Sequence, residues 1–117
     1  MTLLSPYAGV GIRDVKEVLE IANSESNNRR IIRVVCDYYQ ISEKEIFSKS
    51  RQRYCCIARQ VAMYLMCRIK KNSLTSIGHL FNKDHTTVIH SRNHISDLMQ
   101  SLDEIRNDVE NLQMKLL

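Results

Sequence analysis

The stretch SLTSIGHLFNKDHTTVIHSRNHI, residues 73–95, decides the fold of this chain. Its apolar spacing predicts a short helix over 73–81 and a longer helix over 84–102, with a tight turn between them. Two short helices joined by a tight turn have the outline of a helix-turn-helix. We therefore expect this motif at about residues 73–99.

Three residues within the stretch support that outline. Gly78 is small at the point where the two helices must cross closely, and Asn82 stands where the turn needs a residue that tolerates a left-handed backbone. Val88 then directs the second helix toward the interior. The spacing of these residues fits the motif.

The run FNKDHTTVIH, residues 81–90, is unusually polar for a helix that packs on a core. In a helix-turn-helix, the first residues of the second helix face base edges in the major groove. The residues at that place are Asp84, His85, Thr86 and Thr87. Asp accepts from cytosine N4, His bonds an acceptor, and the Thr methyl packs on a thymine methyl. Helix-start amides together with Lys83 favour a phosphate, so the run is interpreted as a DNA-reading edge.

Each of these residues also has a structural interpretation. Asp84 is a preferred helix cap, and it could cap the helix and contact DNA at once. Thr86 and Thr87 could be ordinary first-turn residues. His90 and His94 are four residues apart, but no cysteine or carboxylate accompanies them as a further metal ligand. We therefore expect no metal site and no cofactor.

The rest of the chain is also predicted to be helical. The chain has three glycines and one proline, and after Gly11 it contains no proline and only one glycine, Gly78. A long stretch with so few helix-breaking residues favours helices. Apolar periodicity predicts helices over residues 12–22, 29–39, 54–70 and 103–116. SEKE, residues 42–45, has the form of a capping box that starts one short helix, and NSESNN, residues 23–28, is expected to separate the first two helices. We expect an all-α, compact domain of about six helices.

Several side chains are assigned to the core on this pattern. The short helix after residue 42 should return Ile46 and Phe47 to the interior. Met63 and Met66 are interpreted as gap-filling core residues rather than as part of a cofactor site. One face of the longer motif helix is expected to pack inward through Val88, Ser91, Ile95, Leu98 and Leu102.

The charge of the 117-residue chain is unevenly spread. The net formal charge is −2 over residues 1–28, +9 over 29–95 and −3 over 96–117. A basic middle segment suits a polyanionic partner, although a lysine-rich solvated surface would give the same numbers. No apolar run approaches the ~20 residues that cross a bilayer, and the first twelve residues lack the basic start of a signal peptide. The four cysteines have no C-x-x-C spacing, so we expect reduced thiols in a cytoplasmic protein.

Residues 73–95, together with VCDYYQISEKEIFSKSRQR at 35–53 and ARQVAMYL at 58–65, resemble the C-terminal DNA-binding domain of the bacterial replication initiator DnaA. The resemblance covers about residues 29–99. It implies an all-helical fold whose helix-turn-helix reads the major groove of double-stranded DNA at a DnaA box. It also implies one DNA-binding domain over 29–117, preceded by an extension over 1–28 with one amphipathic helix.

The resemblance also implies roles for individual residues. Base contacts are expected from Asp84, His85, Thr86 and Thr75, and Arg51 matches an arginine that enters the minor groove. Contacts to the DNA backbone are expected from Lys49, Arg53, Lys70, Lys71, Ser73, Lys83, Thr87 and His90.

The chain departs from the family pattern at several positions. NKD, residues 82–84, replaces the more common GGRD, so the turn is one residue shorter and Lys83 stands for the usual arginine. Thr75 stands where a proline is common, and His79 where an acid is common. These departures change the box preference more than they change DNA binding itself. No phosphate-binding loop of the G-x-x-x-x-G-K-[ST] type occurs, so no ATPase activity is expected.

Three classes of function remain to be compared. The first is sequence-specific DNA binding without catalysis by a monomer at the nucleoid, in control of replication initiation or transcription. The second is a protein-interaction module that contacts a replication initiator or another partner without binding DNA, through the stripe of Ile12, Val15 and Leu19. Hydrolytic chemistry is the third, and residues 84–97 show neither paired carboxylates nor a nucleophile motif for it. No small-molecule substrate and no membrane contact are expected.

Overall fold

The computed structural model describes residues 15–69 and 72–116, and within them the chain forms six helices and no strand. The helices are α1 (Val15–Tyr39), α2 (Glu43–Ile46), α3 (Arg53–Cys67), α4 (Leu74–Leu80), α5 (His85–Ser101) and α6 (Asp103–Leu116). The expected all-α class is confirmed. The capping box is also confirmed: Ser42 accepts from the Glu45 amide, and Glu45 accepts from the Ser42 amide.

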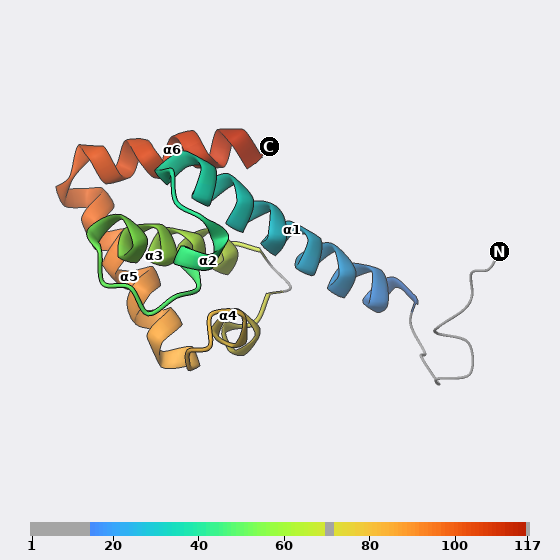
Figure 1. Cartoon of the computed structure of the whole chain (residues 1–117). Coiled ribbons are helices and arrows are strands. Elements are labelled where there is room, and N and C mark those ends of the chain that lie inside the picture. The colour runs from blue at the N-terminus through green and yellow to red at the C-terminus, as the bar shows by residue number, and fades with distance from the viewer. Residues whose placement is uncertain (1–14, 70–71, 117) are drawn as a thin grey trace.

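Helix α3 is the centre of the domain. It packs against α1, α2, α4 and α5, while α6 packs against α1 and α5. In Figure 1, α6 and the end of α1 lie on one side of α3, and α4 lies on the opposite side. Helix α4, the turn and the start of α5 therefore lie at one end of the molecule, while α5 runs along α3 toward α6.

The core is built mainly from small and aliphatic side chains of α3 and its neighbours. Met63 and Met66 are almost completely buried, so their assignment to the core is confirmed. Residues of α5 and α6 complete the core, and the fully enclosed ones are Val88, Ile95, Val109 and Leu112. Each such side chain contributes about 1.5–3 kcal/mol through its removal from water.

The predicted interruption at residues 23–28 is wrong, because α1 runs as one helix from Val15 to Tyr39. That range contains neither glycine nor proline, and Ser and Asn in a helix cost less than about 0.7 kcal/mol each relative to Ala. Packing of its second half, through Ile31 and Ile32, offsets that cost. Residues 12–14 of the expected first helix lie outside the described residues. The division of the chain between 28 and 29 stays a prediction, and α1 crosses it.

Two side chains assigned to the core lie at the surface. Phe47 is 39% exposed because α2 is a single turn: Ile46 takes the inward position, and the next residue points elsewhere. Leu102 is 44% exposed because it follows the last turn of α5 with an extended backbone. Of the other members of that face, Val88, Ser91 and Ile95 are buried as expected, and Leu98 is half-buried against the core.

Candidate nucleic-acid interface

A tight turn at the end of α4 joins the two helices of the motif. The Lys83 amide donates to the Gly78 carbonyl at 2.8 Å, and the Asn82 amide donates to the His79 carbonyl at 3.2 Å. Asn82 has a φ of 56°, which is the left-handed conformation expected for it. These are the features of a Schellman motif, which satisfies the last carbonyls of α4 while reversing the chain.

Gly78 allows the turn to close against α4. A Cβ at this position would lie 2.5 Å from the Lys83 carbonyl oxygen and 3.2 Å from the Asp84 carbonyl carbon. Both neighbours are backbone, so they cannot move aside as a flexible side chain would. The close approach expected at Gly78 is confirmed, and it sets the position of Asp84 at the start of α5.

Asp84 caps α5 and remains exposed. Its Oδ1 accepts from the Thr87 amide at 2.9 Å and from the Thr87 hydroxyl at 3.0 Å. These bonds, the amide first, hold the pKa of the Asp84 carboxyl below its usual value, so the cap is charged at neutral pH. His85 and Thr86 are exposed beside it, whereas Thr87 is half-buried. The start of α5 therefore presents charged and polar groups to solvent.

Helix α4 supplies the opposite wall of this site. Ser73 caps it by accepting from the Ser76 amide at 3.0 Å, and Thr75 is exposed on its first turn. A shallow hollow of about 460 Å³ lies between the two helices and is lined by Thr75, His79, Asn82, Lys83, Asp84 and His85. Four of the predicted DNA contacts, Thr75, Lys83, Asp84 and His85, thus share one surface.

The loop between α2 and α3 lies beside the motif. Its cations Lys49 and Arg51 are exposed, as is Arg53 at the start of α3. The ring of Phe47 lies 5.3 Å, centre to centre, from that of Phe81, which follows α4 directly. This contact joins the basic loop to the end of α4.

Sequence reasoning missed Arg59, which fixes that loop. Its Nε donates to the Ile46 carbonyl at 2.9 Å, and its Nη2 donates to the carbonyls of Ser48 and Ser50 at 2.8 and 3.4 Å. The available signal was an arginine in an otherwise mostly apolar helix, shortly after a basic segment without regular structure.

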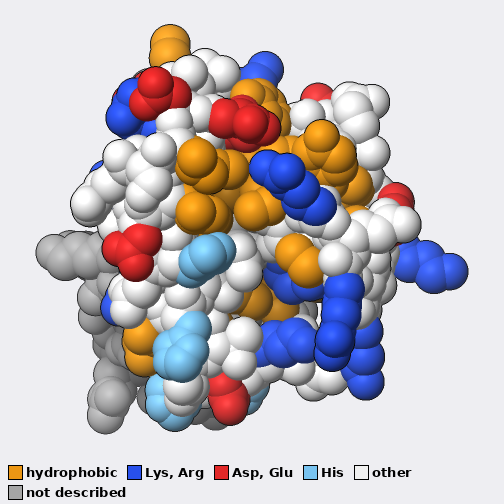
Figure 2. Space-filling model, turned by 90° about the vertical axis from the view of Figure 1, so that its left-hand side faces the viewer, with side chains coloured by type: hydrophobic (Ala, Val, Ile, Leu, Met, Phe, Trp, Pro, Cys, Tyr) orange, Lys and Arg blue, Asp and Glu red, His pale blue; other side chains and the backbone are white. Residues whose placement is uncertain are grey.

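The remaining predicted contacts are more scattered. His90 is exposed one turn beyond Thr86 on α5. Lys70 and Lys71 lie outside the described residues. Figure 2 shows one face of the molecule, on which Lys and Arg side chains gather at the lower right and His side chains at the lower left. Acidic side chains lie mostly above them. The region where Lys and Arg gather therefore attracts anions.

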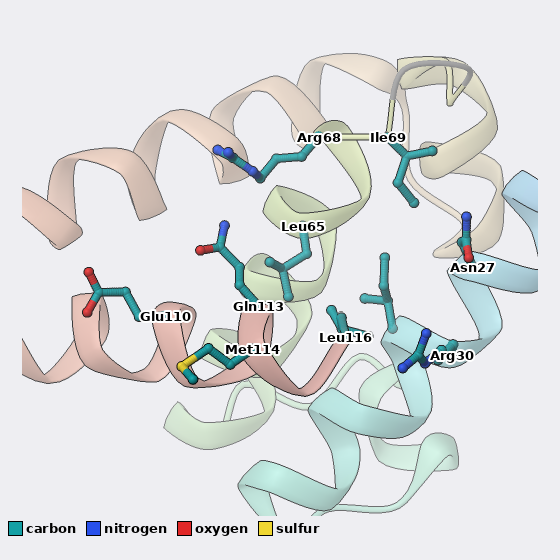
Figure 3. A pocket seen from close by; sticks show the side chains of 10 residues that line it. Asn27, Arg30, Leu65, Arg68, Ile69, Glu110, Gln113, Met114 and Leu116 are labelled. Carbon is teal, nitrogen blue, oxygen red and sulfur yellow. The ribbon is translucent and has the colours of Figure 1, made fainter.

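A second hollow lies away from the motif. It measures about 730 Å³ and is lined by α1, α3 and α6, with Leu65, Ile69 and Leu116 among its apolar residues (Figure 3). Arg30 and Arg68 lie at its rim. None of its lining residues belongs to α4 or α5, so this hollow is separate from the candidate interface.

The described part of the chain lacks two further kinds of site. Over residues 15–69 and 72–116, no group of three or more His, Cys, Asp or Glu side chains is arranged to hold a metal ion. No helix in the same ranges combines the length and apolarity needed to cross a bilayer. All four cysteines are free, and burial raises the pKa of the Cys36 thiol to about 11, which keeps it protonated and unreactive.

Comparison with known proteins agrees with this geometry. Residues 29–95 match the family described as the bacterial DnaA protein helix-turn-helix. The chain is 35% identical over 103 residues to the chromosomal replication initiator protein DnaA of Bordetella pertussis, and 36% identical over 101 residues to that of Jannaschia sp.. It is 34% identical over 103 residues to that of Limosilactobacillus reuteri.

These alignments cover 86–87% of this chain but only 21–23% of the relatives, so the chain spans about a fifth of their length. The family match includes α2 to α4 whole, the second part of α1 and most of α5, with the turn and the capped start of α5. On these grounds the chain belongs to the bacterial DnaA protein helix-turn-helix family.

Proposed function

We propose that this protein binds double-stranded DNA with a sequence preference, with the start of α5 in the major groove, at a site resembling a DnaA box. The observation that carries the proposal is the exposed, capped start of α5, where Asp84, His85 and Thr86 face solvent beside Lys83. A recognition helix contacts base edges with its first residues, and this helix offers polar groups at that place.

The roles of the side chains follow from their positions. His85 and Thr86 contact bases in the major groove, together with Thr75 of α4. Arg51, in the loop before α3, enters the adjacent minor groove. Phosphate contacts come from Lys49, Arg53, Ser73, Lys83, Thr87 and His90, with Lys70 and Lys71 between α3 and α4.

Asp84 has two functions in this proposal. Its Oδ1 accepts from Thr87 and fixes the start of α5, while the charged carboxylate accepts from a cytosine amino group. One residue thereby connects the geometry of the helix start to base choice.

In this proposal the protein has no ATPase activity and no catalytic role. It acts as a monomer in the cytoplasm, at the nucleoid, in control of replication initiation or of transcription. The relatives are named chromosomal replication initiators, which supports the first of these settings. The part of this chain that matches the DnaA helix-turn-helix family, residues 29–95, contains α4 and the start of α5.

Selection from a random duplex pool at two salt concentrations tests the proposal. Wild-type protein should enrich one DNA sequence. That sequence can then be compared with a DnaA box. His85→Ala should cost ~1–3 kcal/mol on the enriched duplex and little on a scrambled one, because a base contact is lost.

Lys83→Ala is the matched control for phosphate contacts. It should weaken binding to both duplexes alike and flatten the dependence on salt, because one counterion fewer is released. Equal losses on both duplexes for His85→Ala would overturn the reading role of α5. Failure of wild-type protein to bind any duplex at low salt would overturn DNA binding altogether.

The hollow between α1, α3 and α6 favours a second candidate function. Its apolar floor and its separation from the motif suit contact with another protein, such as a replication initiator. In that case the chain would retain a partner in a pull-down while remaining silent in a gel shift at low salt.

A further inference from the structure

The loop over residues 47–52 has no helical structure of its own beyond the end of α2, yet it carries Arg51. A segment of this kind normally samples several conformations, and ordering it on binding would lower affinity. Its order in this protein therefore requires contacts from outside the loop.

Arg59 supplies those contacts from the second turn of α3. Its guanidinium bonds three loop-side carbonyls, those of Ile46, Ser48 and Ser50, at 2.9, 2.8 and 3.4 Å. The side chain is half-buried, and Nε and Nη2 are both directed at backbone oxygens. A rigid planar group with several donors is suited to hold a bend of the main chain in one conformation.

Two further contacts complete the arrangement. The Ser50 amide donates to the Ser48 hydroxyl at 3.1 Å, and the Gln52 amide donates to the Ser50 hydroxyl at 3.3 Å. At the other end of the loop, Phe47 rests on Phe81 beside the turn of the helix-turn-helix. The loop is thus fixed to α3 by Arg59 and to the end of α4 by Phe47.

We infer that Arg59 is a positioning residue for DNA recognition: it holds the 47–52 loop so that Arg51 meets the minor groove in register with α5. The inference rests on the proposed function and deepens it. In this inference Arg59 acts through the loop and not by a DNA contact of its own, because its Nε and Nη2 donate to carbonyls of its own chain. Its effect on binding therefore passes through Arg51.

The test is a double-mutant cycle with the duplex that wild-type protein selects from a random pool, and a scrambled duplex of equal composition. Arg59→Ala and Arg51→Ala should each weaken binding to the selected duplex by roughly tenfold, which is the size of one lost contact. The double variant should bind within about twofold of either single variant, because the second change removes nothing further. Arg68→Ala, which removes the same charge from an exposed position at the end of α3, should bind like wild type.

Either of two binding results would overturn the inference. The first is a loss of affinity in the double variant equal to the product of the two single losses, because the two arginines would then act independently. The second is an altered salt dependence for Arg59→Ala on the scrambled duplex beyond that of Arg68→Ala, which would make Arg59 a phosphate contact. Failure of wild-type protein to bind any duplex would instead overturn the proposed function, and the inference with it.

A measurement without DNA keeps the inference testable if Arg59→Ala does not fold. Arg59→Lys keeps the charge and has a single donor group, so hydrogen exchange at the Ser50 and Gln52 amides should become faster while the amides of α3 stay protected. Unchanged exchange at these two amides would overturn the inference.

Discussion

At the scale of single residues, the turn between α4 and α5 depends on Gly78 and Asn82, which are needed for different reasons. Gly78 is required for space, since a Cβ there would meet backbone at 2.5 Å. Asn82 is required for its backbone conformation, with a φ of 56°. Both were identified in the sequence because turn chemistry is local: glycine leaves room for a close approach, and Asn tolerates the left-handed region.

Substitution of Asn82 tests its conformational role. Asn82→Ala should lower the free energy of unfolding by about 1 kcal/mol, because an ordinary L-residue is strained in the left-handed region. Asn82→Gly should remain close to wild type, because glycine occupies that region without strain. Urea denaturation of the two variants measures the difference. Equal stability of the alanine and glycine variants would contradict the strain argument.

At the scale of elements, α5 has a start that serves both folding and the proposed recognition. Its cap Asp84 bonds Thr87 twice, so removing the carboxylate would disturb the helix and the DNA surface together. The two effects separate with asparagine, because Asn caps helices about as well as Asp and carries no charge.

Asp84→Asn should therefore keep the thermal midpoint of wild type but change the base preferred at one position of the selected duplex. Asp84→Ala should lower the midpoint as well, because the Thr87 amide loses its acceptor. Circular dichroism melting and a second selection measure the two effects. A lowered midpoint for Asp84→Asn, or an unchanged base preference, would contradict this division of roles.

The helices themselves differ in how well the sequence predicts them. Both boundaries of α5 and of α6 lie within one residue of the predicted ones. Their starts were predictable because Asp84 and Asp103 are strong local signals for the beginning of a helix. The interruption expected at 23–28 fails because Ser and Asn only disfavour a helix weakly, and α1 is supported by packing that no local pattern reveals.

The candidate site is predictable to a similar degree. The exposed groups near Asp84 follow from the motif, but the guanidinium of Arg59 could not be assigned from its neighbours in sequence. Its three acceptors are main-chain carbonyls in another segment, and a carbonyl has no signature in the sequence. The exposure of Phe47 was missed for a related reason, since a four-residue helix has too little periodicity to fix a face.

At the scale of the whole molecule, the first and last helices are joined by a polar cluster. Tyr38 and Tyr39, at the end of α1, donate to the two oxygens of Asp108 on α6, at 2.7 and 3.1 Å. Earlier on α1, Asn28 exchanges two hydrogen bonds with Asn72, just before α4. Helix α1 thus contacts both ends of the domain through side chains that sequence patterns did not single out.

The tyrosine cluster predicts a loss of stability in alkali. Burial, and then the charge of Asp108, raises the pKa of Tyr39 above its ordinary value. The folded state therefore holds the phenol proton more tightly than the unfolded state, in which Tyr titrates near ~10. Its contribution is present in full below that pH and is lost as the pH rises above it.

Tyr39→Phe should accordingly be less stable by about 1 kcal/mol at pH 7, because one hydrogen bond to Asp108 is lost. Its stability should also decline less steeply than that of wild type between about pH 9 and 11. Tyr54→Phe, at an exposed ring, serves as the control and should follow the wild-type profile. Urea denaturation across this pH range measures both; identical profiles for Tyr39→Phe and wild type would contradict the assignment.

Because α1 is one unbroken helix, a label on it has a defined distance and orientation relative to the domain. Its 25 residues extend about 37 Å, and in Figure 1 its first turns project well beyond the other helices. A fluorophore placed there would report how the protein tumbles in solution. Adding a single residue to the projecting part would swing such a label by roughly 100° around the helix axis, which offers a direct way to calibrate orientation in solution.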